Sequence, residues 1–326
     1  MENKRKIIID CDTGTDDAIA LELAILSEKF DILGITTVWG NQPVEYTALN
    51  TLRVVELLGA NIPVYKGCPE PMTLRLDKER YKNRENNIIF YIDEQGNERS
   101  LHPKILPAPD PKGKIQDKHA CTFLIETLMN AKEKITLVPV GPCTNIGMAI
   151  RMEPKIVEHI DEVVFMGGSV GTGNVTPTAE ANFWNDPEAV KIILNSGVKC
   201  KIATLNATTS APISLEDADK LEALNTKAGK LAADIIRIRA DVSKHLGWSD
   251  GQEEIIHDGV AIAYLIDPSI ITDMRKENVD ISINITDEGT LLLDKNRSSD
   301  DSNVEIMYKA DKNKYFNLMM DLFSKI

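Results

Sequence analysis

The 326-residue sequence has little of what several classes of protein require. It has no apolar run near the roughly 18 residues that cross a membrane. Its start, MENKRK before three isoleucines and an aspartate, lacks the apolar stretch of a signal peptide. It has only 37 Lys and Arg against 50 Asp and Glu, whereas binding to nucleic acid or anionic membranes needs clustered basic residues. We therefore expect no nucleic-acid partner and no membrane partner.

Cysteine is also scarce in this sequence. The odd number of cysteines argues against a disulfide framework, and the absence of a CxxC pair argues against a zinc site built on thiolates. We expect reduced thiols and a cytoplasmic protein. The five cysteines stand at scattered positions: Cys11, Cys68, Cys121, Cys143 and Cys200.

What the sequence does contain is a repeated alternation of short β-branched runs with helical patterns. Such alternation predicts right-handed βαβ units, hence an α/β fold with a mainly parallel central sheet flanked by helices, a Rossmann-like open sheet. Ligands bind such sheets beyond the carboxyl ends of the strands. The predicted strands are 6–10, 32–39, 134–140, 162–166 and 199–205, and the predicted helices are 16–26, 44–58, 120–129, 145–152 and 187–195.

Two stretches interrupt this alternation. Residues 69–118 are polar and dotted with proline, which is typical of an inserted loop or flap, and residues 216–250 have a helical pattern with little strand character. The sequence contains no internal repeat and no convincing linker, so we expect one domain over residues 1–326 with these two insertions. The tail predicts strands at 279–285, 290–293 and 304–308 and a closing helix from Lys312.

Four aspartates cluster where the first strand turns into the first helix: Asp10, Asp12, Asp16 and Asp17. Strand alternation places the first two on one side and turns Cys11 away from them into the core. The other two open a helix, whose dipole favours negative charge there. Four adjacent carboxylates must retain protons or bind a cation, and a set without Cys or His selects Ca²⁺ or Mg²⁺.

Other interpretations of this run remain open. A single aspartate here would more often be a helix cap or a partner of a backbone amide. Phosphatases of the haloacid-dehalogenase type carry Asp-x-Asp-x-Thr/Val after a first strand, with the first Asp as nucleophile, which would be Asp10 here and would work with Mg²⁺. The fifth position of that pattern is Gly14 in this chain, and the Asp16–Asp17 pair is not part of it.

The run Asp10-Cys-Asp12-Thr-Gly14-Thr-Asp16-Asp17-Ala resembles the N-terminal signature of the inosine-uridine-type nucleoside hydrolases, Asp-x-Asp-Pro-Gly-x-Asp-Asp-Ala. The resemblance implies a calcium-dependent enzyme that hydrolyses the N-glycosidic bond of a small-molecule ribonucleoside to ribose and free base. It also implies a homodimer or homotetramer. The resemblance continues in the segments 36–41, 137–146, 166–182, 186–189 and 256–261.

The same resemblance implies roles for individual residues. Asp12 would be the general base that takes a proton from the attacking water, and His257 would protonate the leaving base. Calcium would be held by Asp12, Asp17, the main-chain oxygen of Val140, and Asp258. The substrate's ribose would be bound by polar residues with Met166 beside them: Asp16, Asn41, Asn174, Glu180 and Asn182.

On the base side the sequence departs from the family pattern. Ala181 stands where the family often has an aromatic that stacks on the base, and segment 80–91 does not resemble the family's flap. Trp248, in a glycine-flanked loop before His257, is the candidate for stacking, with an ordinary packing residue as the alternative. The remaining histidines, including His102, are interpreted as structural. A third hypothesis is a calcium-dependent nucleoside- or sugar-binding protein without turnover.

Overall fold

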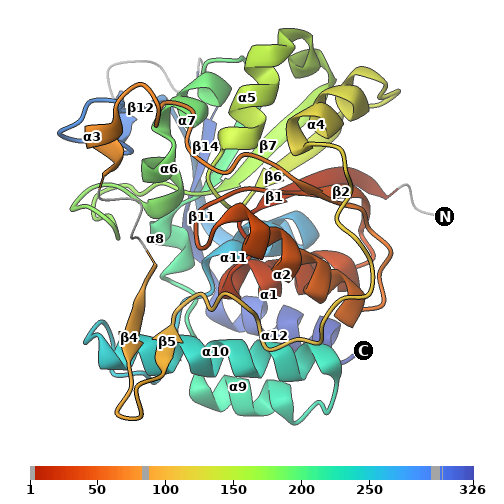
Figure 1. The fold of residues 1–326 in the computed structure, drawn as a ribbon, viewed down its shortest axis with the longest axis vertical. Coiled ribbons are helices and arrows are strands. Elements are labelled where there is room, and N and C mark those ends of the chain that lie inside the picture. The colour runs from red at the N-terminus through yellow and green to blue at the C-terminus, as the bar shows by residue number, and fades with distance from the viewer. Residues whose placement is uncertain (1–3, 83–87, 295–301, 303) are drawn as a thin grey trace.

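The computed structural model describes residues 4–82, 88–294, 302 and 304–326. Its centre is an eight-stranded sheet in the order β11-β14-β8-β7-β6-β1-β2-β3 (Figure 1). All neighbouring pairs are parallel except β11 and β14, so the predicted fold class is confirmed. The strands are β1 (Arg5–Cys11), β2 (Phe30–Thr37), β3 (Val64–Lys66), β6 (Ile135–Pro139), β7 (Ile160–Met166), β8 (Lys199–Ala203), β11 (Ile271–Glu277) and β14 (Val304–Ala310).

Helices cover both faces of this sheet because successive side chains of the central strand point to opposite faces. Ile7, Ile9 and Cys11 of β1 belong to one buried cluster, whereas Ile8 belongs to the other. The first cluster includes residues of α1 (Thr15–Leu26), α2 (Val44–Leu57), α10 (Lys227–His245), α11 (His257–Ile266) and α12 (Lys312–Phe323). The second includes α4 (Ala120–Met129), α5 (Thr144–Met152) and α7 (Pro187–Leu194).

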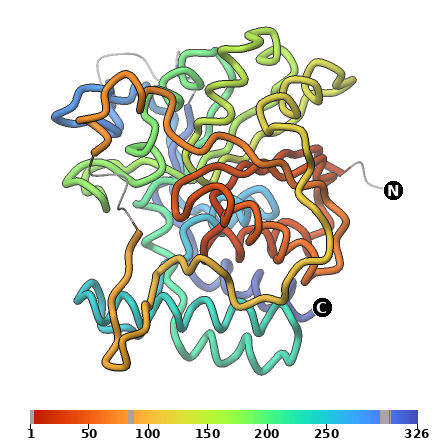
Figure 2. Tube along the Cα trace, in the orientation of Figure 1, coloured from red at the N-terminus to blue at the C-terminus, as the bar shows by residue number. Residues whose placement is uncertain are grey.

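The two predicted insertions lie outside the central sheet. Within its described part, segment 69–118 contains α3 (Lys78–Tyr81) and a hairpin of β4 (Phe90–Ile92) and β5 (Glu98–Ser100), and its trace crosses the front of the molecule (Figure 2). The hairpin lies against α10, where the Tyr91 ring stacks on His245 at 3.6 Å and its hydroxyl donates to Asp241 at 2.7 Å. Segment 216–250 forms most of α9 (Leu215–Glu222) and α10, as its helical pattern predicted.

The C-terminal part corrects two expectations. The strand predicted over 279–285 ends at Ile281, because the chain turns there: the Ser282 N–H donates to the Thr290 carbonyl, and the Gly289 N–H donates to the Ser282 carbonyl. The resulting β12 (Val279–Ile281) pairs with β13 (Leu291–Leu293) in a separate small sheet. Sequence analysis also missed β11, an edge strand whose charged side chains at Asp273, Arg275 and Glu277 hide the apolar pattern.

No helix in the described ranges is long and apolar enough to cross a membrane.

Candidate active site

The sheet reverses its winding between β1 and β6. From β1 the chain continues outward to β2 and β3, and from β6 it continues the other way to β7, β8 and β14. In open α/β sheets such a reversal opens a crevice beyond the carboxyl ends of the two strands. A cavity of about 420 Å³ lies there. Its lining includes every site residue that sequence analysis named, with the exception of Asp12 and Asp17.

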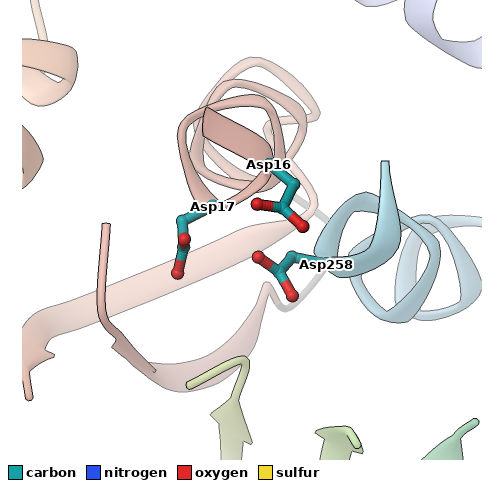
Figure 3. Close-up of side chains that lie close together, drawn as sticks. All are labelled: Asp16, Asp17 and Asp258. Atoms are coloured by element: carbon teal, nitrogen blue, oxygen red, sulfur yellow. The ribbon is translucent and has the colours of Figure 1, made fainter. Parts of the chain in front are cut away.

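Three carboxylates meet at this point (Figure 3). Asp16 and Asp17 come from the first turn of α1 and Asp258 from the first turn of α11, and one oxygen of each lies within 4.8 Å of the others. All three side chains are buried. Burial, together with neighbouring carboxylates, raises the pKa of Asp17 to about 7 and that of Asp258 well above its usual value. The group therefore stays ionised only if a positive charge joins it.

Local hydrogen bonds fix Asp17 and Asp12 at the turn between β1 and α1. The main-chain N–H groups of Gly14 and Asp12 donate to the Asp17 carboxylate at 2.9 and 3.2 Å. The Asp12 carboxylate lies between Gly40 and Gly141, where an added Cβ would come within 2.0 and 2.4 Å of its oxygens. Only glycine at these two positions leaves room for it.

The Asp12 carboxylate keeps one free oxygen. The N–H of Asn41 donates to Oδ2 at 2.7 Å, while Oδ1 is buried and has no hydrogen-bond partner in the described part of the chain. Burial and the nearby Asp17 charge raise the pKa of Asp12 well above its usual value. A buried carboxylate oxygen without a partner is costly, and a cation or a bound water would satisfy it.

This donor set fits a hard cation. Besides the carboxylates, the main-chain oxygen of Val140 lines the cavity, where it accepts from Asn182 Nδ2 at 3.0 Å. Oxygen ligands from carboxylates and a carbonyl, with no thiol in the group, are the set that Ca²⁺ and Mg²⁺ prefer. Asp16 differs from the other carboxylates because Arg239 lies 3.2 Å away. Although burial alone would raise its pKa, the charge of Arg239 holds that pKa below its usual value.

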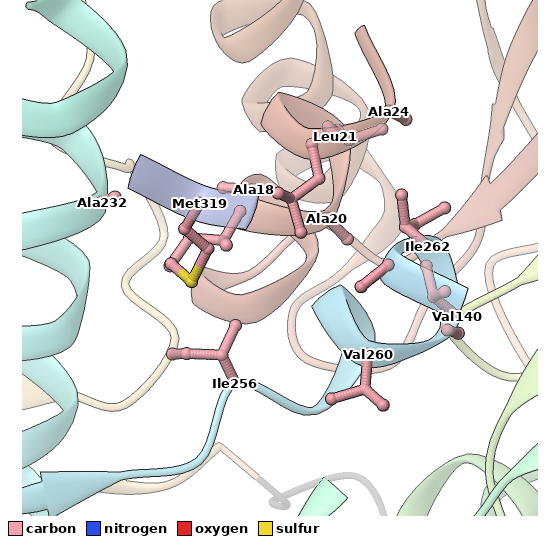
Figure 4. Packing of buried hydrophobic residues seen from close by; sticks show 14 of the residues in the cluster. Ala18, Ala20, Leu21, Ala24, Val140, Ala232, Ile256, Val260, Ile262 and Met319 are labelled. Atoms are coloured by element: carbon pink, nitrogen blue, oxygen red, sulfur yellow. The ribbon is translucent and has the colours of Figure 1, made fainter. Parts of the chain in front are cut away.

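The helices that carry these carboxylates are packed tightly behind them (Figure 4). Small residues, Ala18 and Ala20 on α1, let α1 approach α11, whose Val260 and Ile262 are fully buried in the same cluster. Close packing of this kind restricts rotamers and fixes the helix ends relative to each other. The carboxylates therefore project from a rigid support.

One side of the cavity is polar. Glu180 caps α6 (Ala181–Asn185) by accepting from the N–H groups of Asn182 and Phe183, and burial raises its pKa to about 7. Asn174 Oδ1 accepts from the Ala181 N–H at 3.0 Å. Asn182 Nδ2 also contacts the Met166 carbonyl at 3.2 Å. We call the following residues the polar wall: Asp16, Asn41, Asn174, Glu180 and Asn182.

Apolar side chains also line the cavity, and we call them the apolar rim: Ile89, Leu101, Val175 and Trp248. Trp248 is 58% exposed, so it is a rim residue and not part of the core. Ile89 and Leu101 come from the 69–118 insertion, Val175 from the loop after β7, and Trp248 from the loop after α10. Of the 80–91 segment, residues 83–87 lie outside the described ranges.

His257 begins α11 next to Asp258 and faces the cavity. Its Nδ1 lies 2.8 Å from the Thr208 hydroxyl. Burial lowers the pKa of His257 to about 4, so the ring is neutral at pH 7. A neutral imidazole has one N–H to donate and one nitrogen to accept, and the Thr208 contact orients the ring.

Comparison with known proteins identifies this arrangement. The family model "Inosine-uridine preferring nucleoside hydrolase" matches residues 7–317. The chain belongs to the inosine-uridine preferring nucleoside hydrolase family. This nucleoside hydrolase is 37% identical over 283 residues to the pyrimidine-specific ribonucleoside hydrolase RihB of Escherichia coli, covering 86% of this chain and 84% of the relative.

Solved structures agree with this family. A purine-preferring ribonucleoside hydrolase from Gardnerella vaginalis superposes with a TM-score of 0.84 at 27% identity, covering 98% of each chain. The plant nucleoside hydrolase PpNRh1 superposes with a TM-score of 0.85 at 25% identity, covering 99% of this chain and 100% of the other. The resemblance noted in the sequence is thereby confirmed, and the protein is an N-glycosidase.

Among the cavity residues to which sequence analysis of this nucleoside hydrolase gave no site role are His102 and Arg239. His102 Nδ1 accepts from the Thr15 N–H at 3.2 Å and lies 3.7 Å from Asp16 Oδ1, and burial lowers its pKa to about 4. Arg239 donates to Asp16 and to the Thr15 hydroxyl. No motif surrounds either residue. The one available signal was that Arg239 is a basic residue among the positions that form the buried face of α10.

The family match and the position of Asp10 both argue against the phosphatase interpretation. Asp10 is 1% exposed, accepts from the Thr36 hydroxyl and Asn145 Nδ2, and is not among the residues that line the cavity. A nucleophile in this position would not reach a substrate.

Proposed function

We propose that this nucleoside hydrolase is a calcium-dependent ribonucleoside hydrolase that prefers pyrimidine ribonucleosides. One observation supports both the calcium site and the ribose site: the buried carboxylates and the polar wall lie at the same switch point of the sheet. The pyrimidine preference rests on the 37% identity to RihB, which is named pyrimidine-specific. The purine-preferring relative is less similar in sequence, at 27% identity.

Asp12, Asp17, the Val140 main-chain oxygen and Asp258 would hold the calcium. Bound there, calcium would acidify a water and attract ribose hydroxyls. The unpartnered Oδ1 of Asp12 supports this assignment, as does the raised pKa of Asp258. Asp16 lies in the same cluster but is paired with Arg239, so we assign it to the ribose.

Asp12 is the proposed general base. Burial and the nearby Asp17 raise its pKa above the usual value, which makes this carboxylate a stronger base. Oδ2 is fixed by the Asn41 N–H, which leaves Oδ1 to accept the proton of the attacking water. Gly40 and Gly141 leave the space that this carboxylate occupies, because a Cβ at either position would collide with its oxygens.

The polar wall would bind the ribose. Three of its members are held by hydrogen bonds to main-chain atoms, so they are oriented before the substrate arrives: Asn174, Glu180 and Asn182. Groups fixed in this way can stabilise the positive charge that develops on the sugar as the glycosidic bond breaks.

His257 is the proposed acid for the leaving base, with His102 as the second candidate. Both line the cavity and both are neutral at pH 7, so each can supply one N–H. His257 Nδ1 is engaged with Thr208, and its other ring nitrogen would face the base. Trp248 would stack on the base from the apolar rim.

A nucleoside panel tests the proposal. Purified protein with Ca²⁺ is incubated with uridine, cytidine, inosine and adenosine, and free base and reducing sugar are measured. We expect turnover of ribonucleosides, fastest with the pyrimidines. Tight binding without free base would support the binding-protein hypothesis instead, and release of phosphate from phosphate esters with Mg²⁺ would support a phosphatase.

Metal analysis after gel filtration tests whether the protein binds calcium. We expect calcium to co-purify, and we expect a chelator to abolish turnover and to lower the melting temperature, since a metal that binds only the folded state stabilises it. Zinc in place of calcium, or full activity in excess chelator, would contradict the proposal. The homodimer or homotetramer implied by the family stays a prediction, which light scattering would test.

A further inference from the structure

Two of the five cysteines lie in contact at the base of the 69–118 insertion. The sulfur atoms of Cys68 and Cys121 are 3.9 Å apart, whereas no other pair of cysteine sulfurs in the described chain makes a contact. Cys68 follows β3 and Cys121 lies in the first turn of α4, so the two residues flank the insertion on both sides. They share a small apolar cluster with Val38.

Both cysteines are anchored to the same residue. The Cys68 N–H donates to Asn145 Oδ1 at 2.8 Å, and the Cys121 thiol donates to the Asn145 carbonyl at 3.5 Å. Asn145 in turn donates to Asp10 and to the Thr37 carbonyl, next to the switch point. Asn145 thus holds the Cys68 backbone, while the Cys121 N–H donates to His119 Nδ1 at the start of α4. The two sulfurs must approach by nearly 2 Å in total to reach bonding distance.

We propose that Cys68 and Cys121 form a reversible disulfide under oxidising conditions, which joins the two ends of the insertion. The hydrogen bond between the thiols and their burial raise the pKa of Cys68, so the pair stays reduced until an oxidant is present. Cys68 is 9% exposed and Cys121 is 3% exposed, so a small oxidant such as a peroxide reaches Cys68 first.

The chemistry balances with hydrogen peroxide as the oxidant. The Cys68 sulfur takes one oxygen from the peroxide, which gives a sulfenic acid and one water. The Cys121 sulfur then attacks the Cys68 sulfur, the S–O bond breaks, and the hydroxyl leaves with the Cys121 proton as a second water. Two thiols and one peroxide thus become one disulfide and two waters.

The cross-link would act on the segment that supplies half of the apolar rim. The insertion carries Ile89, Leu101 and His102 to the cavity. A disulfide between residues 68 and 121 closes a loop of about 50 residues, and closing a long loop restricts the unfolded chain. We expect the melting temperature of the oxidised protein to rise by about 5 °C.

Peptide mapping tests the proposal on the unmodified sequence. Trypsin cleaves after Lys66 and Arg75 and after Lys118 and Lys132, so each cysteine falls in a peptide of its own. After mild peroxide treatment and blocking of free thiols, we expect a linked pair of these peptides, a mass about 2 Da below that of the reduced protein, and reversal by dithiothreitol. A linkage involving other cysteines, or none while the thiols disappear, would overturn the proposal.

Variants separate the cross-link from general oxidation. Cys68→Ala and Cys121→Ala should each abolish the mass loss and the rise in melting temperature. The matched control, Cys200→Ala, removes an equally buried thiol on β8 and should keep both effects. If the alanine variants do not fold, Cys68→Ser and Cys121→Ser serve the same purpose. A stabilisation by peroxide that persists without Cys121 would rule out the assigned pair.

Discussion

The polar wall and the apolar rim line one cavity, but they are built differently. Residues of the polar wall follow strand ends or begin helices, and hydrogen bonds to nearby backbone hold several of them, as Glu180 shows. Residues of the apolar rim come from three separate loops, and Trp248 among them is more than half exposed. Under the proposed assignments, the sugar would be bound by residues that the fold itself positions, whereas the base would be bound by loops that can change without disturbing the fold.

The largest expected effect tests the polar wall and the calcium together. We expect 2′-deoxyuridine to be hydrolysed less efficiently than uridine, with kcat/KM reduced by as much as about 10⁴, because the missing hydroxyl leaves buried polar groups unpaired. Steady-state kinetics on the two substrates measure this ratio. Comparable kcat/KM values would show that the polar wall does not recognise the 2′-hydroxyl of the ribose.

The second expected effect tests the general base. Asp12→Asn should reduce kcat by about 10² to 10⁴ while the circular dichroism spectrum stays unchanged, because the amide cannot take a proton from water. The control is Asp10→Asn. Burial raises the Asp10 pKa to about 7, so an amide mimics its protonated form, and a loss below about tenfold is expected. Equal losses of kcat in the two variants would show that Asp12 is not the general base.

The third expected effect tests the apolar rim. Trp248→Ala should lower kcat/KM for uridine by about tenfold, since stacking on a base is worth roughly 1–3 kcal/mol. Inhibition by free ribose should not change, because ribose would contact only the polar wall. A parallel loss of ribose affinity, or no kinetic change, would mean that Trp248 does not contact the base.

The smallest expected effect concerns the packing behind the polar wall. Glu22 on α1 is fully buried, and neither of its oxygens has a hydrogen-bond partner in the described ranges. Burial raises its pKa well above the usual value, so the folded state keeps a proton that the unfolded state loses. The stability linked to Glu22 is therefore present at low pH and declines as pH rises toward the folded-state pKa.

Glu22→Gln should remove that decline. At pH 5 we expect the variant and the unmodified protein to have nearly the same free energy of unfolding. Above pH 5 the variant should gain free energy of unfolding relative to the unmodified protein, by an amount approaching 1.4 kcal/mol per pH unit, as measured by urea denaturation at several pH values. Glu158→Gln, at an exposed position, serves as the control and should show no such slope. A pH-independent difference between the Glu22→Gln variant and the parent would show that Glu22 is ionised in the folded state.

The aspartates at the first strand end were predictable from local rules, whereas the asparagines and Glu180 of the polar wall were named only from the family resemblance. Asp16 and Asp17 open a helix directly after a buried strand, and their positions depend on the turn itself. Strand alternation also placed Cys11 in the core, as observed. In contrast, His102 reaches the cavity from an irregular segment, and Arg239 from a helix turn without a motif. Their positions depend on tertiary packing, which no short-range pattern records.

The same reasoning explains which parts of the fold were predicted. Strands β1, β6 and β7 are buried on both faces and appear in the sequence as apolar runs. The edge strand β11 faces solvent on much of its surface, and its charged residues concealed it. The apolar pattern of a sequence thus predicts strands that are buried, and it does not predict a strand at the solvent-exposed edge of the sheet.

The order of the strands has a consequence for how the site is made. Asp12 is synthesised before β6 and α11, yet Val140 joins it only when β6 pairs with β1, and Asp258 joins it only with α11. Contacts so far apart in sequence form slowly, and domains of this size commonly fold through intermediates. A nascent chain that stops short of α11 would therefore hold an incomplete acidic cluster, so the complete cluster requires synthesis at least through α11.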